Sequence, residues 1–324
     1  AMKLRTSLLS FTALATLGTP GLANCPVATV ADPMGLDPVF PQQLDLVEQQ
    51  AAASCELGFA QNPAIADLNA RILGNADLGP VADRLPVEPL VVMPYDSIGQ
   101  YGGAITGLSK ATESGTSDLL SVRHVNFVRY ADDLQTVVPN IAKAWSWNDD
   151  YTQLTITLRA GHKWSDGAPF TAKDVEFWMN DIIYNPDVYD KTPDRWLFAG
   201  GQAQVEAVGD TTVKFTFPVP TPGILNRFAV DYGQPFQPKH FLGQFHPDVN
   251  ADADSLAQFY GFEKGYDAIK AYYGSSDWMD TPTPMLAHPD KVAGLPLDAA
   301  PTLESHIVIA ETTEGRHFVA NPYY

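Results

Sequence analysis

Residues 154–182 change from one apolar period to another, and this change constrains the fold more than any other feature of the sequence. The first six residues alternate apolar and polar side chains, the pattern of a strand with one buried face. A Ser-Asp-Gly turn follows at 165–167, and Thr171 and Asp174 have the spacing of a helix capping box. An Asn-Pro pair at 185–186 predicts the end of that helix. The predicted buried positions are Leu154, Ile156, Leu158, Val175, Trp178, Met179 and Ile182.

Two further regions have the pattern of β-hairpins. Residues 203–208 and 211–217 flank Gly209-Asp210, which predicts a two-residue turn. Residues 306–312 and 316–321 flank a second turn at Glu314-Gly315. Because helices alternate with strands but hairpins dominate, we expect a mixed α+β fold, within the α/β class, whose mixed sheet contains antiparallel pairs.

The first 23 residues have the pattern of a secretory signal peptide. Two basic residues, Lys3 and Arg5, precede an apolar run over 8–17, and Gly21 and Ala23 fit the small-residue positions before a cleavage site. The apolar run is about half of the roughly 20 residues that a membrane anchor needs. We therefore expect export to the periplasm and cleavage after Ala23. Cys25 leaves a lipoprotein as the alternative, although Asn24 is unsuited to the position before a lipid-bearing cysteine.

The chain contains two cysteines, Cys25 and Cys55. In an oxidising compartment we expect them to form a disulfide, which would stabilise the fold by roughly 3–4 kcal/mol on the chain-entropy model; two unpaired thiols are the alternative. Short helical patterns separated by prolines predict a helical N-terminal extension over residues 24–89.

Charge and motif content limit the functional classes. The 20 Lys and Arg residues against 38 Asp and Glu residues give a net charge of −18, which disfavours binding to nucleic acid or anionic membranes. We find no nucleophile elbow, dinucleotide or P-loop motif, and no HExxH zinc motif. The acidic run at 248–254 fails the calcium-loop pattern in both registers. We expect no catalytic residues, no metal site and no cofactor, so the chain is not expected to be an enzyme.

Residues 158–182, LRAGHKWSDGAPFTAKDVEFWMNDI, resemble the signature of the bacterial extracellular solute-binding proteins of family 5, the peptide, dipeptide and nickel type that serves ABC importers. Residues 98–107, 137–159 and 315–324 support the resemblance in the order that the family uses. The resemblance implies a type II periplasmic binding protein, in which two lobes close over a small solute or oligopeptide. It also implies an ABC permease as partner, no membrane span after signal cleavage, and a monomer.

The resemblance also suggests where a ligand would bind. It places part of the cleft wall in the loop after the first strand of the body, which we expect over residues 103–108. Tyr130 and Trp145 are candidates for apolar cover, with core packing favoured for both, and the WSDG turn is expected to be scaffold. An ordinary polar loop, in which Asp118 caps a helix, is the alternative to a ligand site. The candidate ligand-binding residues are Glu113, Ser114, Gly115, Thr116, Ser117 and Asp118.

The sequence ends at Tyr324, where members of this family are about to enter the second lobe. We expect residues 90–324 to be an incomplete N-terminal lobe, without the second lobe and the returning segment. Uncovered sheet edges and apolar surface would make the isolated chain poorly soluble or molten. Two other functions remain open on the same scaffold, an exported hydrolase and a non-transport sensor or chaperone.

Overall fold

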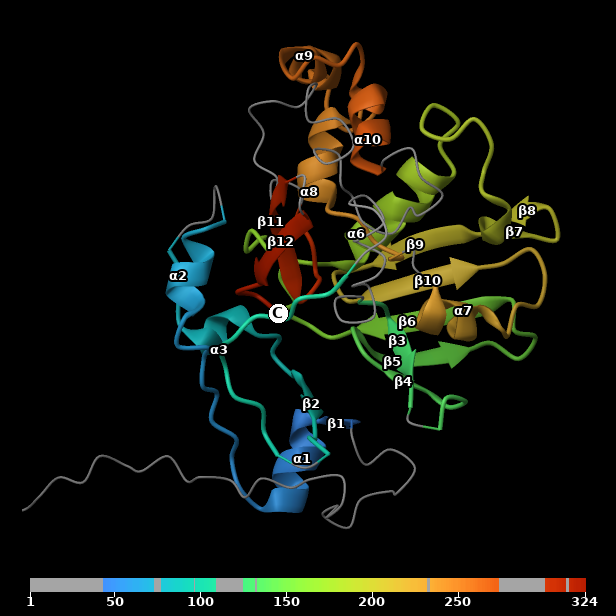
Figure 1. The fold of residues 1–324 in the computed structure, drawn as a ribbon. Coiled ribbons are helices and arrows are strands. Elements are labelled where there is room, and N and C mark those ends of the chain that lie inside the picture. Colours follow the sequence, from blue (N-terminus) through green and yellow to red (C-terminus); the bar gives the residue numbers. More distant parts are fainter. Residues whose placement is uncertain are drawn as a thin grey trace, which may run out of the picture.

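The computed structural model of the protein describes residues 43–72, 77–95, 97–108, 125–131, 133–231, 234–273, 301–312 and 315–324. The largest sheet in these ranges has four strands. Its strand order is β5-β6-β10-β9 (Figure 1). The four strands span Ala142–Trp147 (β5), Gln153–Leu158 (β6), Gln204–Val208 (β9) and Thr212–Thr216 (β10). The α+β class is confirmed, but each strand pair in the described ranges is antiparallel, so they hold no parallel component of the expected mixed sheet.

The alternation predicted for the first strand sets the buried face of this sheet. Leu154 and Ile156 on β6 are fully buried and lie opposite Phe215 and Val213 of β10. Phe127 packs edge-on against Phe228 at a ring distance of 5.1 Å and closes the same core. One continuous apolar cluster therefore joins the sheet, the residues before β3 (Val128–Tyr130) and the helix α7 (Ile224–Val230).

The predicted capping box at Thr171 is present. The Thr171 backbone N–H donates to Asp174 Oδ2 at 2.8 Å, and the Lys173 N–H donates to Thr171 Oγ1 at 3.3 Å. The helix α6 (Ala172–Glu176) begins there and continues as a π-helix, η1 (Phe177–Ile183). The apolar period did not predict the π-helical turn, because the same residues are buried in either form of helix.

The hairpin between β9 and β10 differs from the expectation in its turn. The register pairs Val208 with Thr212, so the connection has the three residues 209–211 rather than two. Backbone hydrogen bonds explain the extra residue. The Thr211 carbonyl accepts from Leu158 N–H at 2.7 Å, and the Asp210 carbonyl accepts from Ala172 N–H at 2.8 Å. The turn thus holds both β6 and the start of α6.

The second hairpin pairs β11 (His306–Thr312) with β12 (Gly315–Ala320), as predicted; residues 313–314 of its turn lie outside the described residues. Short strand pairs join β3 (Val128–Tyr130) to β4 (Val137–Pro139), and β7 (Leu197–Phe198) to β8 (Gly201–Gln202). The remaining helices of the body are η2 (Asp194–Trp196), α7 (Ile224–Val230), α8 (Lys239–Leu242), η3 (Gly243–Phe245), α9 (Ala253–Phe259) and α10 (Gly265–Tyr273).

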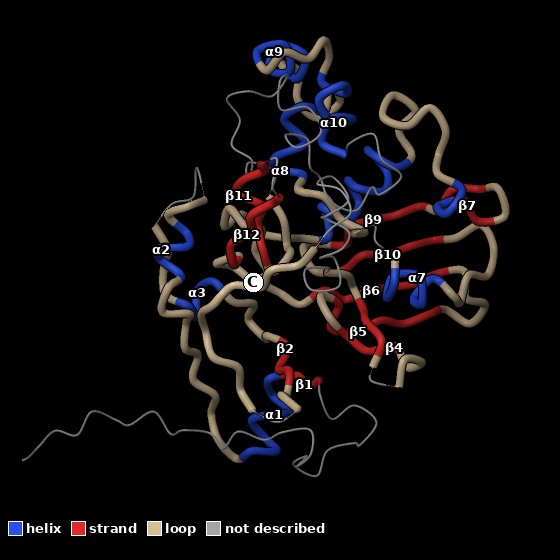
Figure 2. The backbone as a smooth tube through the Cα atoms, viewed as in Figure 1, coloured by secondary structure: helices blue, strands red, loops and turns tan. Residues whose placement is uncertain are grey.

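The N-terminal part, residues 43–72 and 77–92, lies beside this body and contributes its own short elements (Figure 2). These are β1 (Gln43–Asp45), α1 (Leu46–Ala53), α2 (Ile65–Asn69), α3 (Val81–Arg84) and β2 (Leu90–Val92). Strand β1 pairs with β2, which returns the chain to the body. Ile72, after α2, packs with Ile307 and Val319 of the β11–β12 hairpin.

Candidate functional site

The six candidate ligand-binding residues, Glu113, Ser114, Gly115, Thr116, Ser117 and Asp118, lie outside the described residues. The strand expected before them is wrong, because residues 103–108 form no regular element and are exposed. Gly102 and Gly103 have φ values of 123° and 72°, a backbone that does not continue a strand. Ile105 and Leu108 are 84% and 98% exposed, so neither contributes a buried strand face.

The described chain resumes at Val125, and residues 125–128 are buried. Asn126 anchors this end: its carbonyl accepts from Asn140 Nδ2 at 2.9 Å, and its own Nδ2 donates to the Asp231 carbonyl at 3.4 Å. Asp231 also forms an ion pair with Arg195 at 3.2 Å. These contacts fix Asn126 to the segment between β4 and β5 and to the C-terminal end of α7. No pattern in the sequence indicated Asn126.

Tyr130 and Trp145, the candidates for apolar cover, are both half-buried. Trp145 packs against the main core cluster, which agrees with the core role that we favoured. Tyr130 lies at the end of β3, opposite Val137.

The WSDG turn contacts the rest of the lobe through buried groups, as expected of scaffold. Trp164 is 1% exposed and packs edge-on against Phe170 at 5.7 Å. Ser165 exchanges two hydrogen bonds with Thr302, of 2.9 and 3.0 Å, and so binds the turn to the segment before β11. On the exposed side, Asp166 Oδ2 lies 2.7 Å from His240 Nε2. Burial opposes ionisation of Asp166, but the His240 contact outweighs it and lowers the pKa of that carboxyl.

Two buried titratable groups flank this turn. Burial, with the nearby positive charge of Arg159, lowers the pKa of His162 to about 4. Burial raises the pKa of Asp174, although backbone N–H groups of Thr171 and Lys239 donate to its carboxylate. Asp174 therefore caps the start of α6, and the His162 ring packs against Phe170 at a ring distance of 6.3 Å.

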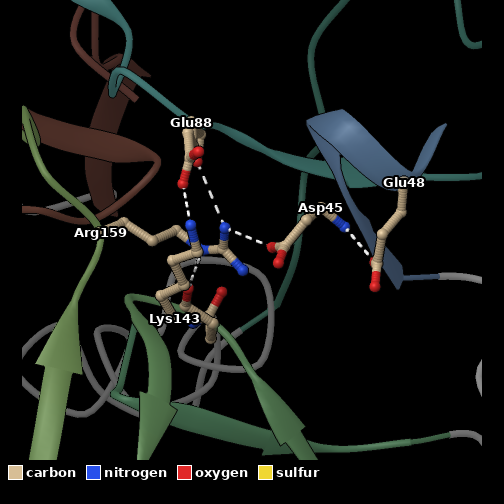
Figure 3. A network of polar contacts seen from close by, with 6 residues as sticks. Asp45, Glu48, Glu88, Lys143 and Arg159 are labelled. Atoms are coloured by element: carbon tan, nitrogen blue, oxygen red, sulfur yellow. Dashed lines mark hydrogen bonds and ion pairs between the residues drawn. The ribbon is translucent and has the colours of Figure 1, made fainter. Parts of the chain in front are cut away.

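A polar junction joins the N-terminal part to the sheet, and Figure 3 shows its side chains. The Arg159 side chain is 1% exposed and pairs with Asp45 Oδ1 at 2.6 Å. Its Nε donates to the Asn140 carbonyl at 2.7 Å and its Nη1 to the Glu88 carbonyl at 3.2 Å. The Glu88 side chain pairs in turn with Lys143 on β5. The junction therefore connects β1, the residues before β2, and two strands of the sheet.

Three further contacts join the body to the N-terminal part. Lys163 donates to the Asp83 carbonyl, and Val87 N–H donates to the Ala160 carbonyl at 2.9 Å. Arg84, itself buried, donates to the Pro322 carbonyl. Basic side chains from the lobe thus meet carboxylates and carbonyls of residues 45–88. Arg159 could have been suspected from the sequence, since it follows the buried strand directly.

Within the described ranges, no group of three or more His, Cys, Asp or Glu side chains could hold a metal ion. Among the helices that the structure describes, none is long and apolar enough to cross a membrane. The predicted disulfide involves Cys25, which lies outside the described residues, as does the predicted signal peptide, so both stay predictions.

Residues 136–271 match the family model described as bacterial extracellular solute-binding proteins, family 5 middle. Over 195 residues the chain is 32% identical to a periplasmic alpha-galactoside-binding protein of Rhizobium meliloti, covering 52% of this chain and 27% of that protein. It is 31% identical over 122 residues to a putative ABC transporter peptide-binding protein of Brucella ovis, covering 37% of this chain and 21% of that one.

Two solved structures resemble the described fold over most of the chain. An oligopeptide-binding protein OppA matches with a TM-score of 0.66 and 30% identity, over 86% of this chain and 40% of that one. The periplasmic binding protein MelB of Agrobacterium fabrum, in complex with stachyose, matches with a TM-score of 0.53 and 22% identity, over 83% and 38%. The second likeness shows the fold alone. The chain spans less than half the length of each of these relatives.

Proposed function

The chain belongs to the bacterial extracellular solute-binding proteins of family 5, and we propose on this basis that it is the substrate-binding component of an ABC importer. In this proposal it captures a peptide or similar polar solute in a cleft between two lobes and delivers it to the permease. The observation that carries the proposal is the match of residues 136–271, which include the sheet, the WSDG turn and α6 to α10. The likeness to OppA over 86% of the chain supports it independently.

The fold agrees with binding rather than turnover. The described lobe has the type II periplasmic-binding-protein fold, and its polar side chains at the WSDG turn are used for capping and packing. In this proposal the candidate loop from Glu113 to Asp118 forms part of the cleft wall. Because the chain spans 40% of the length of OppA, capture between two lobes is proposed for the complete gene product.

The ligand class has two candidates. Peptide is the first, since OppA is an oligopeptide-binding protein and the Brucella relative is described as peptide-binding. An alpha-galactoside is the second, because the Rhizobium meliloti protein matches this chain over 195 residues. Both solutes are polar and would be bound by hydroxyl and backbone groups of the kind that Ser114, Thr116 and Ser117 carry.

We propose that the protein acts in the periplasm as a monomer, after removal of residues 1–23. The family is extracellular, and the basic, apolar and small-residue regions before Asn24 support export.

Titration calorimetry of the complete gene product against tripeptides to pentapeptides and against stachyose tests the proposal. We expect saturable 1:1 binding to one solute class. Ser114→Ala and Thr116→Ala are each expected to weaken binding about fivefold, as the loss of one hydrogen bond of about 1 kcal/mol does. Lys173→Ala, an exposed change on α6, is the control and should bind as the wild type does. The absence of binding to both classes would contradict the proposed ligands.

A further inference from the structure

Among the strands that the structure describes, β9 is an edge of the four-stranded sheet, since β10 is its one neighbour in the strand order. An edge strand carries a row of backbone N–H and C=O groups that can pair with another chain. Here the outward groups belong to Ala203, just before the strand, and to Val205 and Ala207. The alternate residues Gln204, Glu206 and Val208 are exposed.

Three side chains from the neighbouring helix meet these groups. Tyr184 Oη accepts from the Ala203 N–H at 3.0 Å. Asn180 Nδ2 donates to the Val205 carbonyl at 2.8 Å, and Glu176 Oε1 accepts from the Ala207 N–H at 3.2 Å. The side chains therefore present an acceptor, a donor and an acceptor in order, as the backbone of an adjacent strand would.

The residue spacing along the helix α6–η1 and along the strand β9 allows the side chains to meet the backbone groups. The three side chains are four residues apart on the helix, which is about 6 Å of rise, and the backbone groups are two residues apart, which is about 6.8 Å on a strand. Four residues of an α-helix turn about 40° past a full circle, so three such positions would drift off the strand. The π-helical segment η1 turns through a smaller angle per residue, which reverses this drift. The Tyr184 N–H donates to the Met179 carbonyl, five residues earlier, as a π-helix requires.

The Tyr184 hydroxyl is fixed in this role from both sides. It donates to the Trp196 carbonyl at 2.9 Å while it accepts from Ala203. Burial raises the pKa of Tyr184 to about 12, so the phenol keeps its proton at physiological pH. Figure 1 shows α6 running alongside β9, which is the arrangement that these bonds require.

We propose that Glu176, Asn180 and Tyr184 form a seal on the outer edge of β9 that takes the place of a fifth strand and prevents pairing with β9 of a second copy of this chain. A second copy is the relevant partner because an exposed antiparallel edge can pair with itself about a twofold axis. The net charge of −18 opposes such pairing at low salt, so the seal matters most where salt screens that charge.

The test compares Glu176→Ala/Asn180→Ala in the complete gene product with the control Lys173→Ala on the same helix. Hydrogen exchange of the Ala207 N–H should be about fivefold faster in the double variant, because this amide loses its acceptor on Glu176, a hydrogen bond of about 1 kcal/mol. Sedimentation velocity in 0.5 M NaCl, a concentration chosen to shorten the screening length to roughly 4 Å, should show concentration-dependent association of the double variant alone.

Two more variants keep the test decisive if the double variant unfolds. Asn180 is exposed, so Asn180→Ala should fold, and it should give a smaller change in the same direction. Glu176→Gln retains the acceptor oxygen and should behave as the wild type. Exchange and sedimentation of Asn180→Ala that match those of Lys173→Ala would overturn the proposal.

Discussion

Arg159 shows how one buried charge joins distant parts of the chain. Its guanidinium is enclosed by Asp45 and by the carbonyls of Glu88 and Asn140. Removing the partner of a buried charge is costly because that charge remains without water. The ion pair of Lys191 with Asp194 offers a contrast, since its side chains are 76% and 81% exposed.

Asp45→Ala is therefore expected to lower the free energy of unfolding by about 2 kcal/mol, less than a fully buried pair would lose because Asp45 is 30% exposed. Asp194→Ala should change it by less than about 0.5 kcal/mol. Urea denaturation of the two variants checks this difference. Equal effects would mean that the Arg159 junction contributes no more than a surface pair.

His162 predicts a pH dependence of stability. The pKa of His162 is about 4 in the folded protein, against 6.5 for a histidine exposed to water. The unfolded chain therefore binds the proton first as the pH falls, and stability is lost between pH 6.5 and about 4, by up to about 3 kcal/mol. Below that window the loss from His162 is complete. His162→Gln should remove this pH-dependent part of the free energy of unfolding. Urea denaturation at pH 7 and pH 4.5 measures it, and the difference between the two pH values should be smaller in the variant than in the wild type. Parallel pH profiles of the two proteins would contradict the assignment.

At the scale of elements, the turn at 165–167 depends on its glycine. Gly167 has φ of 86°, and a Cβ there would lie 2.8 Å from the Tyr323 hydroxyl. Gly200 has a similar φ of 83° but nothing within 4 Å of the Cβ position. A comparison of substitutions at these two glycines therefore distinguishes the cost of backbone strain from the cost of a steric clash with Tyr323.

Gly200→Ala is expected to cost about 1 kcal/mol from backbone conformation alone. Gly167→Ala should cost about 1–2 kcal/mol more, since the Tyr323 ring must also move. Thermal unfolding of both variants measures the difference. A loss in Gly167→Ala no larger than in Gly200→Ala would show that Tyr323 yields without strain.

Periodicity predicted the elements whose faces are buried, and it failed where hydrogen bonds or distant contacts decide the structure. The strand β6 and the start of α6 follow directly from the sequence, because Leu154, Ile156 and the Thr171 cap have local causes. The π-helical turn and the three-residue turn at 209–211 depend on bonds between elements, which leave no local pattern. The expected strand at 103–108 has the composition of a strand but no buried face in the described structure.

The candidate site was predicted less well than the fold. The resemblance indicated the loop from Glu113 to Asp118, which lies outside the described residues, so it stays a prediction. The place of Arg159 directly after a buried strand was visible in the sequence, but its partners were not, and Asn126 was not indicated at all. The partners of both residues are far away along the chain. Contacts of this kind follow from the tertiary fold rather than from spacing.

At the scale of the whole molecule, the N-terminal part is attached to the lobe by charge and by packing. Its carbonyls and carboxylates meet Lys143, Arg159 and Lys163, and Ile72 packs on the β11–β12 hairpin. The apolar side chains of Ile98, Tyr101, Ile105 and Leu108, which follow this part in the sequence, are exposed. Poor solubility of the isolated chain stays a prediction.

The predicted disulfide adds a covalent closure to this part of the molecule. Protein isolated from the periplasm should begin at Asn24, and its intact mass should not change on alkylation unless it is first reduced. Reduction is expected to lower the free energy of unfolding by roughly 3–4 kcal/mol. Alkylation of Cys25 and Cys55 without reductant would contradict the pairing, and an acylated Cys25 would identify a lipoprotein.

Solute capture without turnover is the central claim, and native mass spectrometry of the complete gene product with peptides or stachyose tests it most directly. We predict one intact solute per monomer, released unchanged when the complex is dissociated. Release of a cleaved solute would contradict the claim and indicate an exported hydrolase.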